Sequence, residues 1–151
     1  MYIDTAYLFG GMHEETRKKI LESAIEESHA SGDLLFHQDD PALNFYILTE
    51  GRVRISVGPQ GLLAHVASDP GDVIGWSSLV GNDTYTASAE CLGSVKVSKI
   101  EKSKLDQVLH ADPESGMTFF KHLAALIGLR LVDSYKATLA AHDVREPRVF
   151  G

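Results

Sequence analysis

The chain has 151 residues, of which 44% are hydrophobic and 23% charged, and its formal net charge is −7 at pH 7. This length and composition predict one soluble domain with a buried core, and the apolar runs are shorter than the roughly 20 residues that span a bilayer. The N-terminus has no basic region ahead of an apolar one, so no secretory signal is indicated and we expect a cytoplasmic protein. The acidic balance and the lack of a Lys/Arg cluster argue against direct binding to nucleic acid or to a membrane.

An N-terminal segment, residues 1–13, precedes the first predicted helix, which spans residues 14–29. Apolar residues at helical spacing, separated by charged residues, indicate this helix. They are Ile20, Leu21, Ala24 and Ile25. A polar triplet at residues 31–33 then predicts a turn.

Short strand candidates follow at close spacing, separated by turn signals rich in Gly, Pro, Asp and Asn. These strands are predicted at residues 34–37, 45–49, 51–57, 62–67, 72–74, 86–91 and 94–100. In the third of them Val53, Ile55 and Val57 alternate with polar residues, which predicts one buried and one solvated face. The whole pattern predicts a mainly β fold with helices, an antiparallel β jelly-roll barrel, within a domain of residues 14–141.

Two helices are predicted after the last strand, a short one at residues 101–109 and a long one at residues 113–141. Asp112 is a good N-cap and Pro113 suits the first turn of the long helix. One set of its side chains steps by three and four residues, as in a helix–helix seam. This seam consists of Met117, Phe120, Ala124, Ile127, Leu131 and Ser134.

A second apolar set, Phe119, Leu123 and Leu126, lies on the adjacent face of the long helix. We therefore expect one face to pack on the barrel and the seam to pack on a second copy, giving a homodimer through the C-terminal helix. The alternative is a single wide apolar stripe that only covers the barrel. The tail, residues 142–151, carries charge and a proline and is predicted to be poorly ordered.

Residues 70–90, here called the cassette, have the layout of an anion-binding site. Gly75 precedes a short segment of helical potential, residues 76–80. A glycine before a helix allows backbone N–H groups to point at an anion, and the helix dipole favours negative charge there. Gly75 and the backbone of Ser77 and Ser78 are therefore candidate donors to a phosphate or carboxylate, with the hydroxyl of Thr86 as a further donor.

The order of parts resembles the cyclic nucleotide-binding domain of the catabolite-activator and fumarate–nitrate regulator superfamily. GDLLFHQDDPALNFYILTEGRVRIS (residues 32–56) is similar to the family's opening strands, and PGDVIGWSSLVGNDTYTASA is similar to its phosphate-binding cassette. The long helix from Pro113 resembles the family's dimerisation helix. The resemblance covers roughly residues 14–141 and implies a double-stranded β-helix.

Two departures from the family's cassette bear on ligand binding. The resemblance implies a Glu after Gly75 that holds the ribose 2′-hydroxyl, and an Arg before Thr86 that pairs with the cyclic phosphate. Trp76 and Tyr85 stand at these positions instead. A charge-assisted hydrogen bond contributes roughly 1.5–3 kcal/mol, so losing both contacts should weaken binding by about two orders of magnitude or more. Trp76 and Tyr85 either fill the pocket or line it for a flatter, less charged ligand.

These observations predict a non-catalytic, small-molecule-sensing regulatory module that does not bind cyclic AMP or cyclic GMP in the usual way. We expect no cofactor, and a small anionic or aromatic effector, a cyclic nucleotide or another molecule, in the barrel. No helix-turn-helix follows the long helix in this sequence, so we do not expect the chain to read DNA.

Three alternatives stay open from the sequence. The first is a module for binding a partner protein, with its pocket filled. The second is a haem or redox sensor, for which Cys91 with His65 or His122 would be the ligands. The third is a cupin-type metalloenzyme, which is disfavoured because the seven histidines form no closely spaced pair on a strand, and because His37 and His65, the two on strands, are predicted at the surface or a loop edge.

Overall fold

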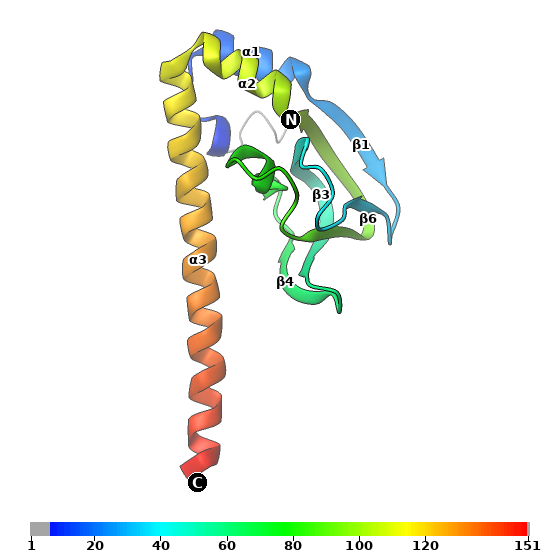
Figure 1. The fold of residues 1–151 in the computed structure, drawn as a ribbon, viewed down its shortest axis with the longest axis vertical. Coiled ribbons are helices and arrows are strands. Elements are labelled where there is room, and N and C mark those ends of the chain that lie inside the picture. Colours follow the sequence, from blue (N-terminus) through cyan, green and yellow to red (C-terminus); the bar gives the residue numbers. More distant parts are fainter. Residues whose placement is uncertain (1–6, 151) are drawn as a thin grey trace.

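The computed structural model describes the backbone of residues 7–150 and the side chains of residues 7–140. Figure 1 shows a sheet with helices α1 and α2 at one end and a long helix, α3, which runs beside the sheet and continues past it. In chain order the elements are η2 (Tyr7–Phe9), α1 (Glu14–Ser23), β1 (Ile25–His29), β2 (Leu34–Phe36), β3 (Asn44–Val57), β4 (Leu62–Ala67), β5 (Val73–Ile74), η3 (Trp76–Leu79), β6 (Ser88–Glu101), α2 (Lys102–Ala111) and α3 (Pro113–Phe150).

All strand pairs are antiparallel and centre on the two long strands β3 and β6. The main order is β1-β6-β3-β4, with β2 paired to β6 and β5 paired to β3. This arrangement confirms the predicted jelly-roll fold, although the path of the described strands is open rather than a closed barrel. Because the sheet is open beside β4 and β5, a helix can cover that side.

The sequence pattern divides each long strand into two, and the structure joins them. The predicted strands 45–49 and 51–57 form the single strand β3, which changes register around Gly51. Gly51 has φ +94°, and a Cβ there would collide with the carbonyl oxygen of Ser94 on β6. Only glycine allows this bend and this close approach of two backbones. The predicted strands 86–91 and 94–100 likewise form β6.

The predicted helix over residues 14–29 is wrong in its second half. Helix α1 ends at Ser23, and residues 25–29 form β1, which pairs with β6 from Ile25 opposite Lys99 to His29 opposite Val95. The backbone N–H and C=O groups of β6 offer a ladder that the local periodicity cannot reveal. Glu27 also pairs with Lys99 across the two strands, with 2.8 Å between carboxylate and ammonium.

Helix α3 begins at Pro113 as predicted and continues to Phe150, beyond the predicted end at Ala141. No glycine or proline occurs between residues 129 and 146, so the backbone chemistry does not end the helix at Ala141. The predicted tail, residues 142–151, is therefore helical up to Phe150, and residue 151 lies outside the described part. No described helix is long and apolar enough to cross a membrane.

The start of α3 is fixed by a polar network that links it to α1. The Asp112 carboxylate accepts hydrogen bonds from the Ser115 N–H (3.3 Å) and the Thr16 hydroxyl (2.6 Å), and it lies 2.8 Å from the His13 ring. Hydrogen bonds from Ser115, Thr16 and His13 hold the pKa of Asp112 well below its ordinary value. The predicted N-cap thus also sets the angle at which α3 leaves α2.

Below this network, one face of α3 is buried. Phe119 and Leu123 are 0% and 2% exposed and pack with Phe45 of β3 and Leu105 of α2 in one core cluster. A second cluster lies between the strands. The second apolar set predicted from the sequence is therefore the face that covers the sheet, and it holds α3 against β3 and the cassette.

We expect Phe119→Ala to lower the free energy of unfolding by about 3–5 kcal/mol, because it removes a fully buried aromatic side chain and leaves a cavity. Lys121→Ala, on the exposed face of the same helix, is the control and should change stability by less than about 0.5 kcal/mol. Urea denaturation followed by circular dichroism measures both. Equal stability of the two variants would contradict the assignment of this helix face to the core.

Candidate functional site

The cassette contains a glycine in the left-handed conformation where the chain passes from β5 into η3. Gly75 has φ +81°, and a Cβ at this position would approach Phe36 to 3.2 Å and Tyr85 and the Asn44 carbonyl oxygen to 3.3 Å. A side chain there would face both a disfavoured backbone conformation and crowding. Glycine is thus required for the turn that places Trp76 and Ser77 next to Thr86.

Two hydroxyl groups meet after this turn. The Ser77 and Thr86 hydroxyl oxygens lie 2.8 Å apart in a hydrogen bond, which joins η3 to the chain before β6. The Ser78 hydroxyl instead donates to the Gly75 carbonyl oxygen at 3.0 Å, and Ser78 is fully buried. Ser77 and Thr86 can therefore present hydroxyls to a ligand, whereas the Ser78 hydroxyl is used within the turn.

Tyr85 is part of the core. Its ring stacks on Phe36 with centroids 3.8 Å apart, and its side chain is 4% exposed. Its hydroxyl donates to the Asn44 carbonyl oxygen at 2.5 Å and accepts from the Asn44 N–H at 3.2 Å. Burial raises the pKa of this phenol, so it is neutral at physiological pH. Tyr85 thus replaces a charged cassette residue by a neutral one that is fixed to the backbone.

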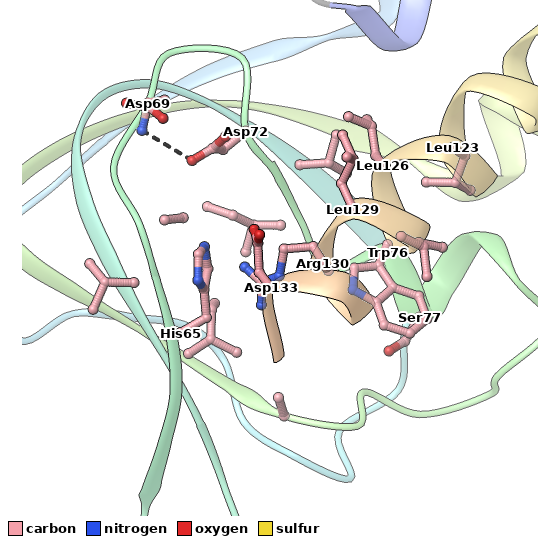
Figure 2. A pocket seen from close by; sticks show the side chains of 18 of the residues that line it. His65, Asp69, Asp72, Trp76, Ser77, Leu123, Leu126, Leu129, Arg130 and Asp133 are labelled. Carbon is pink, nitrogen blue, oxygen red and sulfur yellow. Dashed lines mark hydrogen bonds between the residues drawn. The ribbon is translucent and has the colours of Figure 1, made fainter. Parts of the chain in front are cut away.

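A cavity of about 420 Å³ lies between the cassette, strand β4 and helix α3. Its lining includes Gly75, Trp76, Ser77 and Thr86 from the cassette, and Leu126 from α3. Figure 2 shows the Trp76 indole beside the α3 side chains Leu129 and Arg130, with His65 across the space from it. Trp76 is 36% exposed and lines the cavity without filling it, so the space behind the cassette is open and partly polar.

The charged groups of the cavity come from β4, from the turn before β5 and from α3. The basic side chains among the lining residues are His65 and Arg130, and the acidic ones are Asp69, Asp72 and Asp133. Burial lowers the pKa of Arg130, while Asp72 and Asp133 act in the opposite direction. Burial and the neighbouring Arg130 also lower the pKa of His65, which favours its neutral form at pH 7. Arg130 is therefore the main positive charge in the cavity.

The structure brings together four of the six predicted site residues at the cavity, namely Gly75, Trp76, Ser77 and Thr86. Ser78 and Tyr85 are buried behind it and are not part of its lining. His65, predicted at the surface or a loop edge, is half-buried and faces the cavity. The roles of the six predicted site residues toward a ligand stay predictions.

Sequence reasoning missed Arg130 as a residue of this site. A signal for it was present, because Arg130 is four residues after Leu126 and seven after Leu123, on the helix face that covers the sheet. An arginine within an otherwise apolar helix face indicates that a polar cavity or a partner lies next to it, because charged side chains are rarely buried without one.

The predicted seam of α3 is largely exposed in the single chain. Met117, Phe120 and Leu131 are 68%, 41% and 51% exposed, and Ala124 and Ser134 are also exposed. Ile127 differs, because it is half-buried and lines the cavity. The face adjacent to the core thus carries large apolar side chains that are largely exposed, although the Phe120 ring also packs edge-on against Phe119 at a centroid distance of 5.1 Å.

The haem-ligand candidates do not converge. Cys91 is fully buried between the strands, and His122 packs against the Tyr7 ring at a centroid distance of 4.5 Å. Of the three candidates, only His65 lines the cavity. Within the described residues, no group of three or more His, Cys, Asp or Glu side chains is placed to hold a metal ion.

Comparison with known proteins gives a consistent result. The family described as the cyclic nucleotide-binding domain matches residues 26–112. A cAMP-dependent protein kinase regulatory subunit of Hypocrea atroviridis is 24% identical over 108 residues, which cover 72% of this chain and 23% of that subunit. The chain thus spans about a quarter of the length of this relative.

Solved structures show the same fold. A candidate cyclic nucleotide-binding protein from Geobacter metallireducens is 26% identical, with a TM-score of 0.75 over 84% of this chain and 93% of that one. The catabolite activator protein of Thermus thermophilus is 21% identical, with a TM-score of 0.70 over 90% of this chain and 63% of that one. The resemblance inferred from the cassette and the order of elements is confirmed.

We expect Tyr85→Phe to lower the free energy of unfolding by about 1–3 kcal/mol, because it leaves the buried Asn44 N–H and C=O groups unpaired. Tyr46→Phe is the matched control, since its buried hydroxyl makes one long hydrogen bond, 3.4 Å to the Leu35 carbonyl oxygen. This control should cost less than about 1 kcal/mol. Denaturant unfolding measures both, and a Tyr85→Phe protein as stable as wild type would exclude a structural role for this hydroxyl.

Proposed function

The chain belongs to the cyclic nucleotide-binding domain family, and from this premise we propose that it is a non-catalytic regulatory module that senses one small molecule. The observation that carries the proposal is the cavity, which has the cassette on one side and helix α3 on the other. A ligand in this space contacts both elements at once. Its binding free energy can therefore favour one position of α3 over another.

The effector differs from a cyclic nucleotide held in the family's usual manner. Tyr85 offers no positive charge to a cyclic phosphate, and Trp76 offers no carboxylate to a ribose hydroxyl. The remaining candidate donors of the cassette are the backbone N–H groups of Gly75 and Ser77 and the hydroxyls of Ser77 and Thr86. The two hydroxyls already bond to each other at 2.8 Å, and the Ser78 N–H donates to the Gly75 carbonyl oxygen at 3.3 Å. Trp76 supplies an indole surface on which a flat group can stack.

The open cavity favours a sensor over an interaction module with a filled pocket. Its volume of about 420 Å³ lies within the usual range of small-molecule sites. A regulatory rather than catalytic role is in keeping with the name of one relative, a kinase regulatory subunit.

We expect at least one compound in a panel of nucleotides, organic acids and aromatic metabolites to raise the Tm of the protein, because a ligand that binds only the folded state stabilises it. In isothermal titration cyclic AMP should bind more weakly than micromolar. Ala87→Phe, which places a ring in the cavity, should abolish the shift in Tm. Ala64→Phe, at an exposed position of β4, is the matched control and should retain it.

A panel in which no compound stabilises the wild-type protein would overturn the sensing function. A shift in Tm that survives in Ala87→Phe would place binding outside this cavity. Cyclic AMP binding at micromolar or tighter affinity would show that the Trp76 and Tyr85 replacements matter less than proposed.

The seam of α3 supports a second proposal, that the chain forms a homodimer through this helix. Large apolar side chains at Met117, Phe120 and Leu131 are exposed along one face, and burying them against a second copy removes apolar area from water. Because the adjacent face of α3 borders the cavity, a dimer of this kind would transmit the position of α3 from one cavity to the other.

Phe120→Glu should shift the protein from dimer to monomer in sedimentation velocity, because it places a charge at the largest apolar side chain of the seam. The control is Lys121→Glu, an adjacent exposed position outside the seam, which should remain dimeric. A wild-type protein that sediments as a monomer at high concentration would exclude the dimer.

A further inference from the structure

The cavity contains a positive charge that lies outside the cassette. Arg130 is half-buried on α3, and Figure 2 shows its guanidinium beside Asp133, with His65 on one side and the Trp76 indole on the other. Within the described part of the chain, it makes no hydrogen bond and no ion pair shorter than 4 Å. A guanidinium has five N–H donors in a fixed plane, and withdrawing them from water without a partner costs free energy.

The acidic residues nearby do not provide that partner. The Asp72 carboxylate accepts hydrogen bonds from the backbone N–H groups of Ser68 (3.1 Å) and Asp69 (3.0 Å), so it is held by its own turn. Asp133 is exposed on the next turn of α3. Both carboxylates act on Arg130 only through their electrostatic field. The guanidinium donors thus remain available to a molecule in the cavity.

The cassette cannot compete for an anion in the same way. Tyr85 is fixed by its two hydrogen bonds to Asn44 and by its stack on Phe36, and it is not part of the cavity lining. His65 faces the cavity, but burial and Arg130 disfavour its charged form. An anionic group therefore finds its strongest attraction on the α3 side.

Resting on the proposed function, we propose that the ligand is a monoanion whose charged group is bound by Arg130 of α3, in place of a cassette arginine. The shared chemistry is a single negative charge with a planar or forked pair of oxygens, as in a cyclic phosphodiester or a carboxylate. The flat remainder of the ligand lies against Trp76.

The charges around the cavity limit the ligand to one negative charge. Asp69, Asp72 and Asp133 line the same space as Arg130, so a second negative charge on the ligand meets net repulsion. The net charge of the whole chain, −7, also repels a second negative charge on the ligand. A dianion such as a nucleoside 5′-monophosphate is therefore disfavoured relative to a monoanion of similar shape.

Four probes test this inference by isothermal titration at concentrations up to about millimolar. Cyclic AMP is a phosphodiester monoanion, indole-3-acetate an aromatic carboxylate, 5′-AMP a dianion and adenosine a neutral nucleoside. We expect at least one monoanion to bind the wild-type protein more tightly than 5′-AMP. Which of the two binds distinguishes a phosphodiester from a carboxylate as the group at Arg130.

Arg130→Gln should weaken the binding of that monoanion about tenfold to a hundredfold, because it removes a charge-assisted hydrogen bond. Arg130→Lys should retain part of the affinity. Lys136→Gln, which removes an exposed cation from the same helix, is the matched control and should bind like wild type. Circular dichroism melting checks that each variant is folded.

The outcomes separate this inference from the proposed function. Monoanion binding that is equal in wild type and Arg130→Gln overturns the role of Arg130 and leaves the sensing function standing. Binding of adenosine alone, or tighter binding of 5′-AMP than of either monoanion, overturns the monoanion assignment. If no probe binds the wild-type protein and the wider panel gives no shift in Tm, both proposals fail.

Discussion

The packing of helix α3 against the open side of the sheet is the constraint on which the candidate site depends. Phe119 and Leu123 bury the first turns of the helix over Phe45, and the Asp112 network fixes where these turns begin. Arg130 is two helical turns beyond Leu123 on the same face. The buried end of α3 thus determines that a guanidinium lines the cavity beside the apolar side chains of Leu126 and Leu129.

The main positive charge at the cavity, Arg130, thus lies on helix α3 and not in the cassette. A charge at position 85 would lie in the segment between η3 and β6, outside helix α3. Here the cassette position is occupied by Tyr85, whose hydroxyl pairs with the Asn44 backbone. An anion that binds Arg130 is bound by α3 itself, so affinity and the position of the helix become one equilibrium.

The two faces of α3 have different environments over the same turns. One face packs on the core and then borders the cavity, while the other exposes Met117, Phe120 and Leu131. Ile127 lies between them, since it belongs to the seam by spacing and lines the cavity in the structure. Any shift of the helix toward a ligand would therefore also displace the seam.

The sequence by itself determined the features that depend on local chemistry. The glycine turn at Gly75 and the Asp112 cap with Pro113 were predictable, as was the family resemblance of the cassette. The alternation predicted in β3 is seen only in part, because Val53 is buried whereas residues 54–57 are all half-buried. Tertiary structure alone decided that residues 25–29 form a strand, because their ladder partners on β6 lie some seventy residues away in the chain. It also decided that Tyr85 is a core residue while Arg130 faces the cavity. The physical reason is that burial and charge environment depend on which distant segments pack together, whereas turns, caps and alternation depend on residues only a few positions apart.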